Sequence, residues 1–282
     1  MTTQTTSFPA RLHVFLARDN PHQGLVLRRG PANQVATIGW NRSNDTFMLG
    51  QWCKGRIYEY ECDLSPDGKY FLYAATDKRN EQRWTALSEV PYLTALDLSF
   101  NPMAVLGGGF FISKDTYWVN YPNYTFLNNR FKRSPLIPVV QHPAAPKLKV
   151  WNGLYLHKLQ YDGWFSIHSI DGNEYCFSKP INSRWQLIKT VHLKCIKRAL
   201  GQAYIHETHQ LVDVHNKRNI DFPDWEWADI DSERIVFAQK GKLCSLPFTK
   251  NELDIGKTNI LYDFTPMVFE EIKAPYDRRH FD

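Results

Sequence analysis

Apolar residues in this 282-residue chain recur in short runs of four to eight, separated by glycine, proline, asparagine and aspartate. The runs are rich in Val, Ile, Tyr, Phe and Trp, which favour β-strands, and helical periodicity is scarce. Strands that follow one another about every eight to twelve residues are typical of all-β sandwiches, barrels and propellers. The sequence therefore predicts an all-β fold.

We expect strands wherever such a run is bounded by turn residues. The expected ranges are 11–17, 24–28, 34–40, 46–51, 57–64, 70–76, 83–90, 110–113, 116–119, 136–140, 149–151, 154–159, 164–170, 174–178, 185–190, 192–196, 203–207, 210–215, 227–230, 234–238 and 242–247.

Tight turns give the strongest local signals. Ser65-Pro66-Asp67-Gly68 joins two expected strands, with proline presetting φ at the second turn position and glycine supplying a positive φ. Asp162-Gly163 and Asp171-Gly172 are dipeptides typical of two-residue hairpins. These turns indicate antiparallel strand pairs close together in the chain.

One hairpin pattern occurs twice. Cys62–Ala74 aligns with Ala228–Ala238: each reads strand, Asp-Leu or Asp-Ile, polar turn, and a second strand ending in an aromatic residue and alanine. The first copy resembles the hairpin of β-propeller repeats of the WD40-like and TolB-like kind, and the second resembles a degenerate copy. The resemblance implies four-stranded blades in a fold that usually serves binding. About 45–50 residues per blade favour five blades, with six possible.

The expected organisation is one propeller domain over residues 11–275, with an N-terminal tail at 1–10 and a C-terminal tail at 276–282. Five prolines between Pro122 and Pro146 limit ladder formation, so we expect a loop-rich insertion around residues 120–146.

Composition and motifs indicate which cellular compartment and which classes of binding partner to expect. The five cysteines are scattered and form no CxxC pair, so we expect free thiols and neither a metal nor a cofactor. No basic and apolar leader is visible, which favours a cytoplasmic location. No apolar stretch reaches the length of a membrane span, so no membrane partner is expected. The net charge of +5 is a mild surplus, which makes nucleic acid a less favoured partner than protein.

Catalytic signatures are weak. Gly107-Gly108-Gly109 lacks the rest of a phosphate-binding motif and indicates a close backbone approach before a strand. His206-Glu207-Thr208-His209 has the wrong spacing for a helical zinc motif, so we expect a hairpin turn with solvated histidines, His215 being the nearest third ligand. Four carboxylates could line a central cavity, and for the first and last of them a structural role is favoured. They are Asp63, Asp97, Glu226 and Asp229.

The favoured function is a non-catalytic protein-interaction module or scaffold subunit. Aromatic and cationic side chains gather in the expected insertion, and such residues are enriched at protein interfaces. The predicted partner-binding residues are Tyr121, Tyr124, Phe126, Arg130, Phe131 and Arg133. Two alternatives stay open. One is a carbohydrate-active hydrolase with paired carboxylates in a central cavity. The other is a module that binds single-stranded nucleic acid through the same aromatic stretch.

Overall fold

The structure is a computed structural model of the whole chain. It describes residues 10–30, 34–77, 82–100, 107–120, 136–139, 153–193, 205–250 and 252–276. The chain forms two compact units. Unit 1 comprises Met1–His13, Arg28–Ala32 and Leu159–Met267, and unit 2 comprises Val14–Leu27, Asn33–Lys158 and Val268–Asp282.

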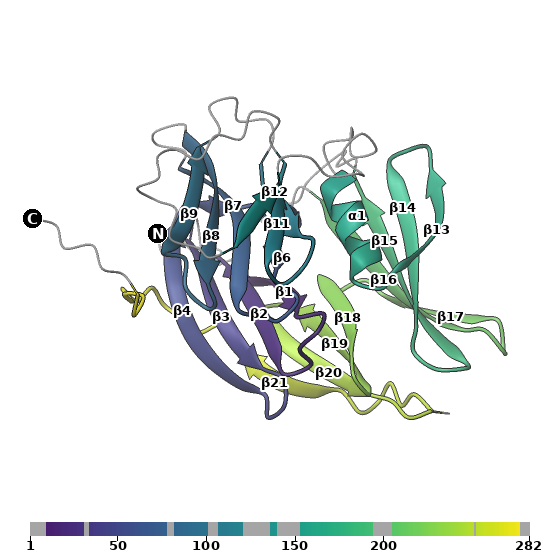
Figure 1. Cartoon of the computed structure of the whole chain (residues 1–282). Coiled ribbons are helices and arrows are strands. Elements are labelled where there is room, and N and C mark those ends of the chain that lie inside the picture. The colour runs from purple at the N-terminus through teal and green to yellow at the C-terminus, as the bar shows by residue number, and fades with distance from the viewer. Residues whose placement is uncertain are drawn as a thin grey trace, which may run out of the picture. The chain divides into compact units, whose positions relative to one another are not determined.

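The described strands form five sheets, each built from strands that are consecutive in the chain (Figure 1). The first sheet contains β1 (Arg11–Leu16), β2 (Gln23–Arg29), β3 (Gln34–Asn41) and β4 (Thr46–Lys54). The second contains β5 (Arg56–Ile57), β6 (Asp63–Leu64), β7 (Tyr70–Asp77), β8 (Gln82–Glu89) and β9 (Ala95–Phe100), with the 3-10 turn η1 (Glu59–Glu61). The third contains β10 (Gly109–Phe111), β11 (Thr116–Val119) and β12 (Ile137–Val139).

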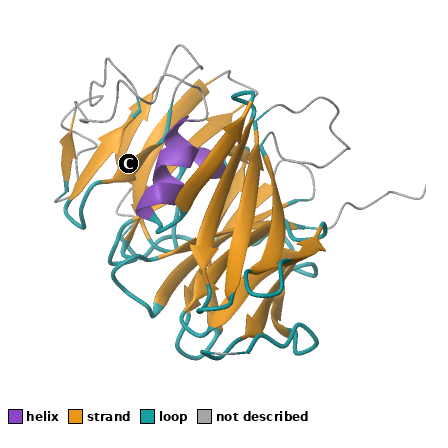
Figure 2. Ribbon diagram, turned by 90° about the vertical axis from the view of Figure 1, so that its right-hand side faces the viewer, coloured by secondary structure: helices purple, strands orange, loops and turns teal. Residues whose placement is uncertain are grey.

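The last two sheets follow the single α-helix of the described residues, α1 (Gly153–Tyr161) (Figure 2). The fourth sheet contains β13 (Phe165–Ile170), β14 (Glu174–Pro180), β15 (Trp185–His192), β16 (His206–Asp213) and β17 (Arg218–Phe222). The fifth contains β18 (Trp227–Asp231), β19 (Arg234–Gln239), β20 (Lys242–Pro247) and β21 (Asn259–Asp263).

The predicted all-β fold is confirmed, with five sheets in the sequential order of the blades of a five-bladed propeller. Pairing is antiparallel in the second, fourth and fifth sheets. In the third sheet β11 and β12 run parallel. Most of the expected insertion, at residues 121–135 and 140–146, lies outside the described residues, as do the expected strand at 149–151 and Cys195.

Three strands were missed by the sequence patterns: β9, β17 and β21. β17 and β21 are five residues long and largely exposed. β17 is interrupted by polar residues and β21 is polar at both ends, so neither contains the apolar run of four that the prediction required. The expected strand at 57–64 is divided by η1 into β5 and β6. The expected strands at 203–207 and 210–215 are one continuous strand, β16.

The expected strand at 154–159 is wrong, because these residues belong to α1. The segment Leu154-Tyr155-Leu156-His157 carries β-compatible residues, but Leu154, Tyr155 and Leu159 are buried together in one helix. Asp162-Gly163 ends this helix instead of forming a hairpin. The N–H of Gly163, at a φ of 83°, donates to the carbonyl of Gln160, as glycine commonly does after a helix.

Two other predicted turns are confirmed. The N–H of Gly68 donates to the carbonyl of Ser65 at 2.8 Å, and Gly68 has a φ of 79°. Asp171 and Gly172 both have positive φ, at 50° and 65°, and lie in the loop between β13 and β14. The conformation of a tight turn depends mainly on its own residues, so the sequence alone was enough to predict these two turns.

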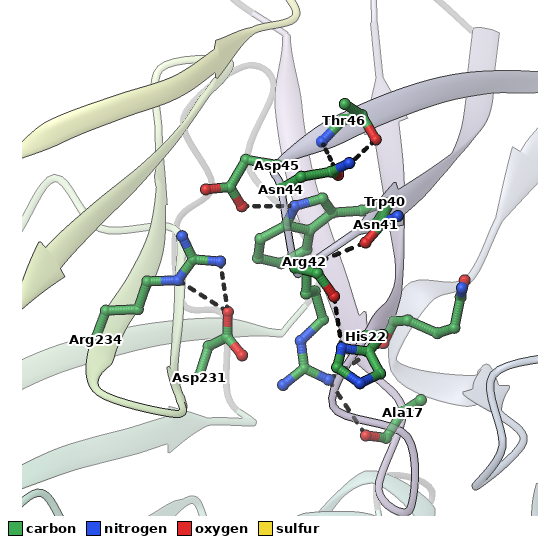
Figure 3. A network of polar contacts seen from close by, with 12 residues as sticks. Ala17, His22, Trp40, Asn41, Arg42, Asn44, Asp45, Thr46, Asp231 and Arg234 are labelled. Atoms are coloured by element: carbon green, nitrogen blue, oxygen red, sulfur yellow. Dashed lines mark hydrogen bonds and ion pairs between the residues drawn. The ribbon is translucent and has the colours of Figure 1, made fainter.

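A polar network holds the turn between β3 and β4 (Figure 3). The indole N–H of Trp40 donates to the carboxylate of Asp45 at 3.1 Å. The backbone N–H of Thr46 donates to the side chain of Asn44. The Arg42 guanidinium donates to the carbonyls of the preceding turn, Ala17 among them. The side chain of Arg42 therefore joins the two turns of the first sheet.

Within unit 1, residues of β1 and β2 contact residues that flank the strands of the fifth sheet. The buried guanidinium of Arg28 donates to the carbonyls of Phe264 at 3.1 Å and Thr265 at 3.2 Å. The backbone N–H of Leu12 donates to the carboxylate of Glu226 at 3.3 Å.

The three glycines before β10 permit close packing, as the sequence indicated. Gly108 has a φ of 72°, and its N–H donates to the Thr85 hydroxyl at 2.8 Å. A Cβ on Gly109 would lie 1.9 Å from the Trp118 carbonyl oxygen, on the paired strand β11. The backbone of β10 therefore requires glycine here.

We predict that Gly109→Ala lowers the free energy of unfolding by more than 2 kcal/mol, because the paired strand has to move. Gly172→Ala is the matched control. A Cβ there meets nothing within 4 Å, so only the positive φ costs about 1 kcal/mol. Urea unfolding of both variants gives the comparison. Equal losses would show that the close approach of β10 and β11 is absent.

Candidate protein-binding surface

The predicted partner-binding residues lie outside the described residues. This holds for Tyr121, Tyr124, Phe126, Arg130, Phe131 and Arg133. Their role stays a prediction, and the candidate site is built below from the described residues alone.

Asp63 on β6 is buried in a web of polar contacts inside unit 2. One carboxylate oxygen accepts the backbone N–H of Phe111 at 2.8 Å. The other accepts the guanidinium of Arg18 at 2.7 Å and lies 3.7 Å from the ammonium of Lys158. That ammonium also lies 4.4 Å from the ring centroid of Phe15. These contacts give Asp63 a structural role of the kind the sequence favoured, joining β6 to β10 and α1.

Asp229 on β18 has similar surroundings inside unit 1. Its carboxylate accepts the ammonium of Lys179 at 2.6 Å and the indole N–H of Trp164 at 3.2 Å. Asp63 pairs with Leu72 and Asp229 with Val236, in each case the third residue of the following strand. The two aspartates thus occupy equivalent positions in the sequence repeat, and each meets a lysine.

The other two candidate carboxylates are also engaged. Asp97 accepts the hydroxyl of Tyr117 at 3.0 Å, and both side chains are buried. Glu226 accepts the backbone N–H of Leu12, and burial raises the pKa of its carboxyl.

The segment His206–His209 is not a turn, which corrects the sequence-based expectation. All four residues lie in β16, paired in register with β15. Glu207 and His209 are buried on the face that meets Lys189, whereas His206 stacks on His192 of β15 at 4.3 Å between ring centroids. The polar composition suggested a turn, but a cation on the neighbouring strand allows these side chains to be buried.

Lys189, Glu207 and His209 form a buried charged cluster. The ammonium of Lys189 lies 3.2 Å from Oε2 of Glu207, and Nε2 of His209 lies 3.4 Å from the same oxygen. Nδ1 of His209 lies 3.2 Å from the carbonyl oxygen of Trp225. The Lys189 ammonium lies 4.7 Å from the ring centroid of Trp164. No sequence motif predicted this cluster, because Lys189 lies on β15 and the other two residues lie on β16, well separated in the sequence.

The cluster holds one buried ion pair. Burial opposes ionisation of Glu207, but the charge of Lys189 and the contact with His209 outweigh it and lower the pKa of this carboxyl below its usual range. Burial lowers the pKa of His209, against the opposing pull of Glu207. Because Lys189 already neutralises Glu207, a charged His209 would leave a net charge in the core. His209 is therefore neutral at pH 7.

The most exposed apolar strand is β13, at one edge of the fourth sheet (Figure 1). All six of its residues are exposed, including Phe165 at 64%, Ile167 at 50% and Ile170 at 47%. One side of β13 pairs with β14, and its other side pairs with no strand among the described residues. The sheet therefore presents free backbone groups beside large apolar side chains.

The register assigns the side chains of β13 to two faces. Phe165 lies opposite Ser178 and Ile170 opposite Glu174, so both share the outer face of the sheet. Ser166 lies opposite Phe177, a core residue that is 2% exposed. A β-bulge falls between Ser166 and His168, at Ile167. The sequence predicted a strand at 164–170, but its exposure depends on packing with distant segments.

No three His, Cys, Asp or Glu side chains in the described ranges are placed so that they could hold a metal ion. Within the same ranges no helix is both long and apolar enough to span a bilayer.

We predict that Asp63→Ala lowers the free energy of unfolding by about 3 kcal/mol, because it leaves buried cations and the Phe111 amide without their acceptor. Asp115→Ala, at an exposed position, is the control and should stay within about 0.5 kcal/mol of wild type. Thermal and urea unfolding measure both. An Asp63→Ala protein as stable as wild type that lost a hydrolase activity would contradict the structural role.

We predict that stability falls as the pH is lowered from about 7 to 5.5. His209 has a lowered pKa in the folded state, so as the pH falls through about 6.5 the unfolded chain binds more protons than the folded one. The resulting slope of the free energy of unfolding rises to at most about 1.4 kcal/mol per pH unit for each histidine. His206 adds to the slope, because burial lowers its pKa too. Glu207 acts in the same direction below about pH 4.5, where its contribution to stability is lost.

His209→Gln should make the free energy of unfolding depend less steeply on pH between 7 and 5.5, because up to one proton fewer is taken up on unfolding. Urea unfolding at several pH values measures this dependence. His215→Gln, at an exposed position beyond the same strand, is the control and should keep the wild-type slope. A wild-type slope in the His209→Gln protein would contradict the neutral buried imidazole.

Comparisons with known proteins extend this description. No protein family and no curated protein matches the sequence. An uncharacterized protein of Listeria monocytogenes EGD-e is similar in structure at 9% identity and a TM-score of 0.31, covering 89% of this chain and 66% of that one. This chain thus spans just under two thirds of the Listeria protein.

Two proteases are also among the similar structures. For the β-propeller domain of the Trilobed protease from Pyrococcus furiosus, identity is 10%, the TM-score 0.27, and coverage 91% of this chain and 99% of that one. For the tricorn protease, identity is 10%, the TM-score 0.24, and coverage 90% and 26%. The chain is thus similar to β-propeller domains at low TM-scores, which says nothing about its activity or partners.

Proposed function

We propose that this protein is a non-catalytic, cytoplasmic interaction module or scaffold subunit whose succession of sheets displays a binding surface to a protein partner. The observation that carries the proposal is β13, an edge strand exposed at every position, with three large apolar side chains. Exposed apolar patches of this kind mark interaction sites in soluble proteins. We further propose that the sheets are β-propeller blades of the WD40-like or TolB-like kind.

The contacts of the candidate carboxylates support a binding role over hydrolysis. A glycosidase needs two carboxyl groups about 5–9.5 Å apart with access to the sugar. Asp63 and Asp229 each accept a basic side chain and a second N–H donor. Carboxylates held in this way fix the packing of strands, so the sheets supply a frame and the surface supplies the function.

A second contact region is proposed from the sequence. The aromatic and basic residues predicted at 121–133 belong to types enriched at protein interfaces. We include them as a separate arm of the test, because a scaffold can hold partners at more than one place.

We predict that Phe165→Ser with Ile170→Thr abolishes stoichiometric capture of a partner by the tagged protein from its native cells. Ile260→Thr is the matched control, since Ile260 is an exposed apolar residue of another edge strand, β21. The captured partner is then purified and its binding measured with both variants. Tyr124→Ala with Arg130→Ala tests the second region in the same way. A partner that binds all three variants as tightly as wild type would contradict the proposal.

A further inference from the structure

We propose that β13 accepts an extended strand of the partner protein, which continues the fourth sheet by one strand. This inference rests on the proposed function and names the chemistry of its partner: an extended, uncharged segment with apolar side chains at alternate positions. Strand addition of this kind draws affinity from main-chain hydrogen bonds and specificity from the alternating side chains.

The hydrogen-bonding groups of β13 select a strand as the occupant. An antiparallel edge strand points alternate N–H and C=O groups away from its neighbour. β13 pairs with β14 through its residues on either side of the bulge, and its opposite side pairs with nothing in the described chain. Only another extended backbone offers donors and acceptors at the matching spacing.

The side chains of β13 define the pattern of the incoming strand. Phe165 and Ile170 lie on the outer face, where apolar partner residues would cover them. Ser166 and Ser169 lie on the other face, opposite Phe177 and Tyr175 of β14. Small or hydroxyl side chains of the incoming strand fit next to these two serines. The bulge at Ile167 bends the strand, which favours a short paired segment.

The absence of Asp, Glu, Lys and Arg distinguishes β13 from the other edges. Natural edge strands are protected by charged residues or proline against pairing with another chain. Among the described strands, the edges β1, β4, β5, β6, β9, β17, β18 and β21 each contain a charged residue, and β12 contains proline. The remaining edge, β10, has three residues and is buried. β13 is thus the one long described edge without this protection.

The size of the edge favours a peptide segment over a second copy of this chain. Six residues extend only about 20 Å. A stable dimer needs about 800 Å² of surface on each partner, more than one strand edge offers. An extended peptide segment can form the backbone hydrogen bonds of the whole edge without burying the additional surface that a dimer needs.

The test uses defined peptides and the full chain. The first probe is a fluorescent decapeptide in which valine and threonine alternate between terminal lysines. The second has the same composition, with all valines preceding all threonines. Two further probes repeat the alternating sequence with methyl groups on the backbone nitrogens of either the valines or the threonines. Fluorescence anisotropy measures the affinity of each probe for wild type, for Phe165→Ser with Ile170→Thr, and for Ile260→Thr.

We expect the alternating peptide to bind wild type at least about tenfold more tightly than the block peptide. One methylated probe should lose about tenfold, because alternate amides of a strand point to opposite edges and only one edge pairs with β13. The β13 double variant should lose about tenfold and Ile260→Thr nothing. Methylation leaves the protein unaltered, so this arm does not depend on the variant folding.

Three results would overturn strand addition. The first is equal affinity of all four peptides, and the second is an unchanged affinity in the β13 double variant. The third is a wild-type dimer in sedimentation that the double variant dissociates, which would identify a second copy as the occupant. A purified partner that depends on Phe165 and Ile170 while methylated peptides bind normally would leave the proposed function standing and refute strand addition alone.

Discussion

Three buried carboxylates, each facing a lysine from another element, constrain how the strands of this protein pack. Asp229 meets Lys179 of β14 at 2.6 Å, and Glu207 meets Lys189 of β15 at 3.2 Å. Asp63 meets Lys158 of α1 at 3.7 Å, together with an arginine. Removing one partner of a buried ion pair typically costs about 3–5 kcal/mol, because the remaining charge is left buried. The strands that carry these side chains can therefore pack in few ways other than the one observed.

These buried carboxylates have a structural role. Acidic residues that in sequence suggest a catalytic pair are here used in packing, as for Asp63 and Asp229. On the surface, β13 is the feature from which we infer a binding role. Among the described residues, β13 is an edge strand with large exposed apolar side chains and no partner on its outer side. Such an edge invites aggregation, and we infer that a partner covers it.

The sequence predicted what local chemistry determines. The turns at Ser65–Gly68 and Asp171–Gly172 followed from the φ values that their residues favour, and most strands followed from apolar runs. It missed what packing determines. The helix α1 has the residues of a strand but is buried along one side, and β16 buries Glu207 and His209 because a lysine stands on the next strand. The strand β13 was predicted, whereas its place at an open edge was not, because edge position depends on every strand of the sheet.

The most direct test of this account is amide hydrogen exchange along the fourth sheet of the isolated protein. If the outer side of β13 is unpaired, alternate amides between Phe165 and Ile170 exchange about as fast as those of an exposed loop. The amides of β15 and β16, paired on both sides, exchange far more slowly. Protection of every β13 amide to the level of β15 would show that the edge is already covered, and would contradict the account.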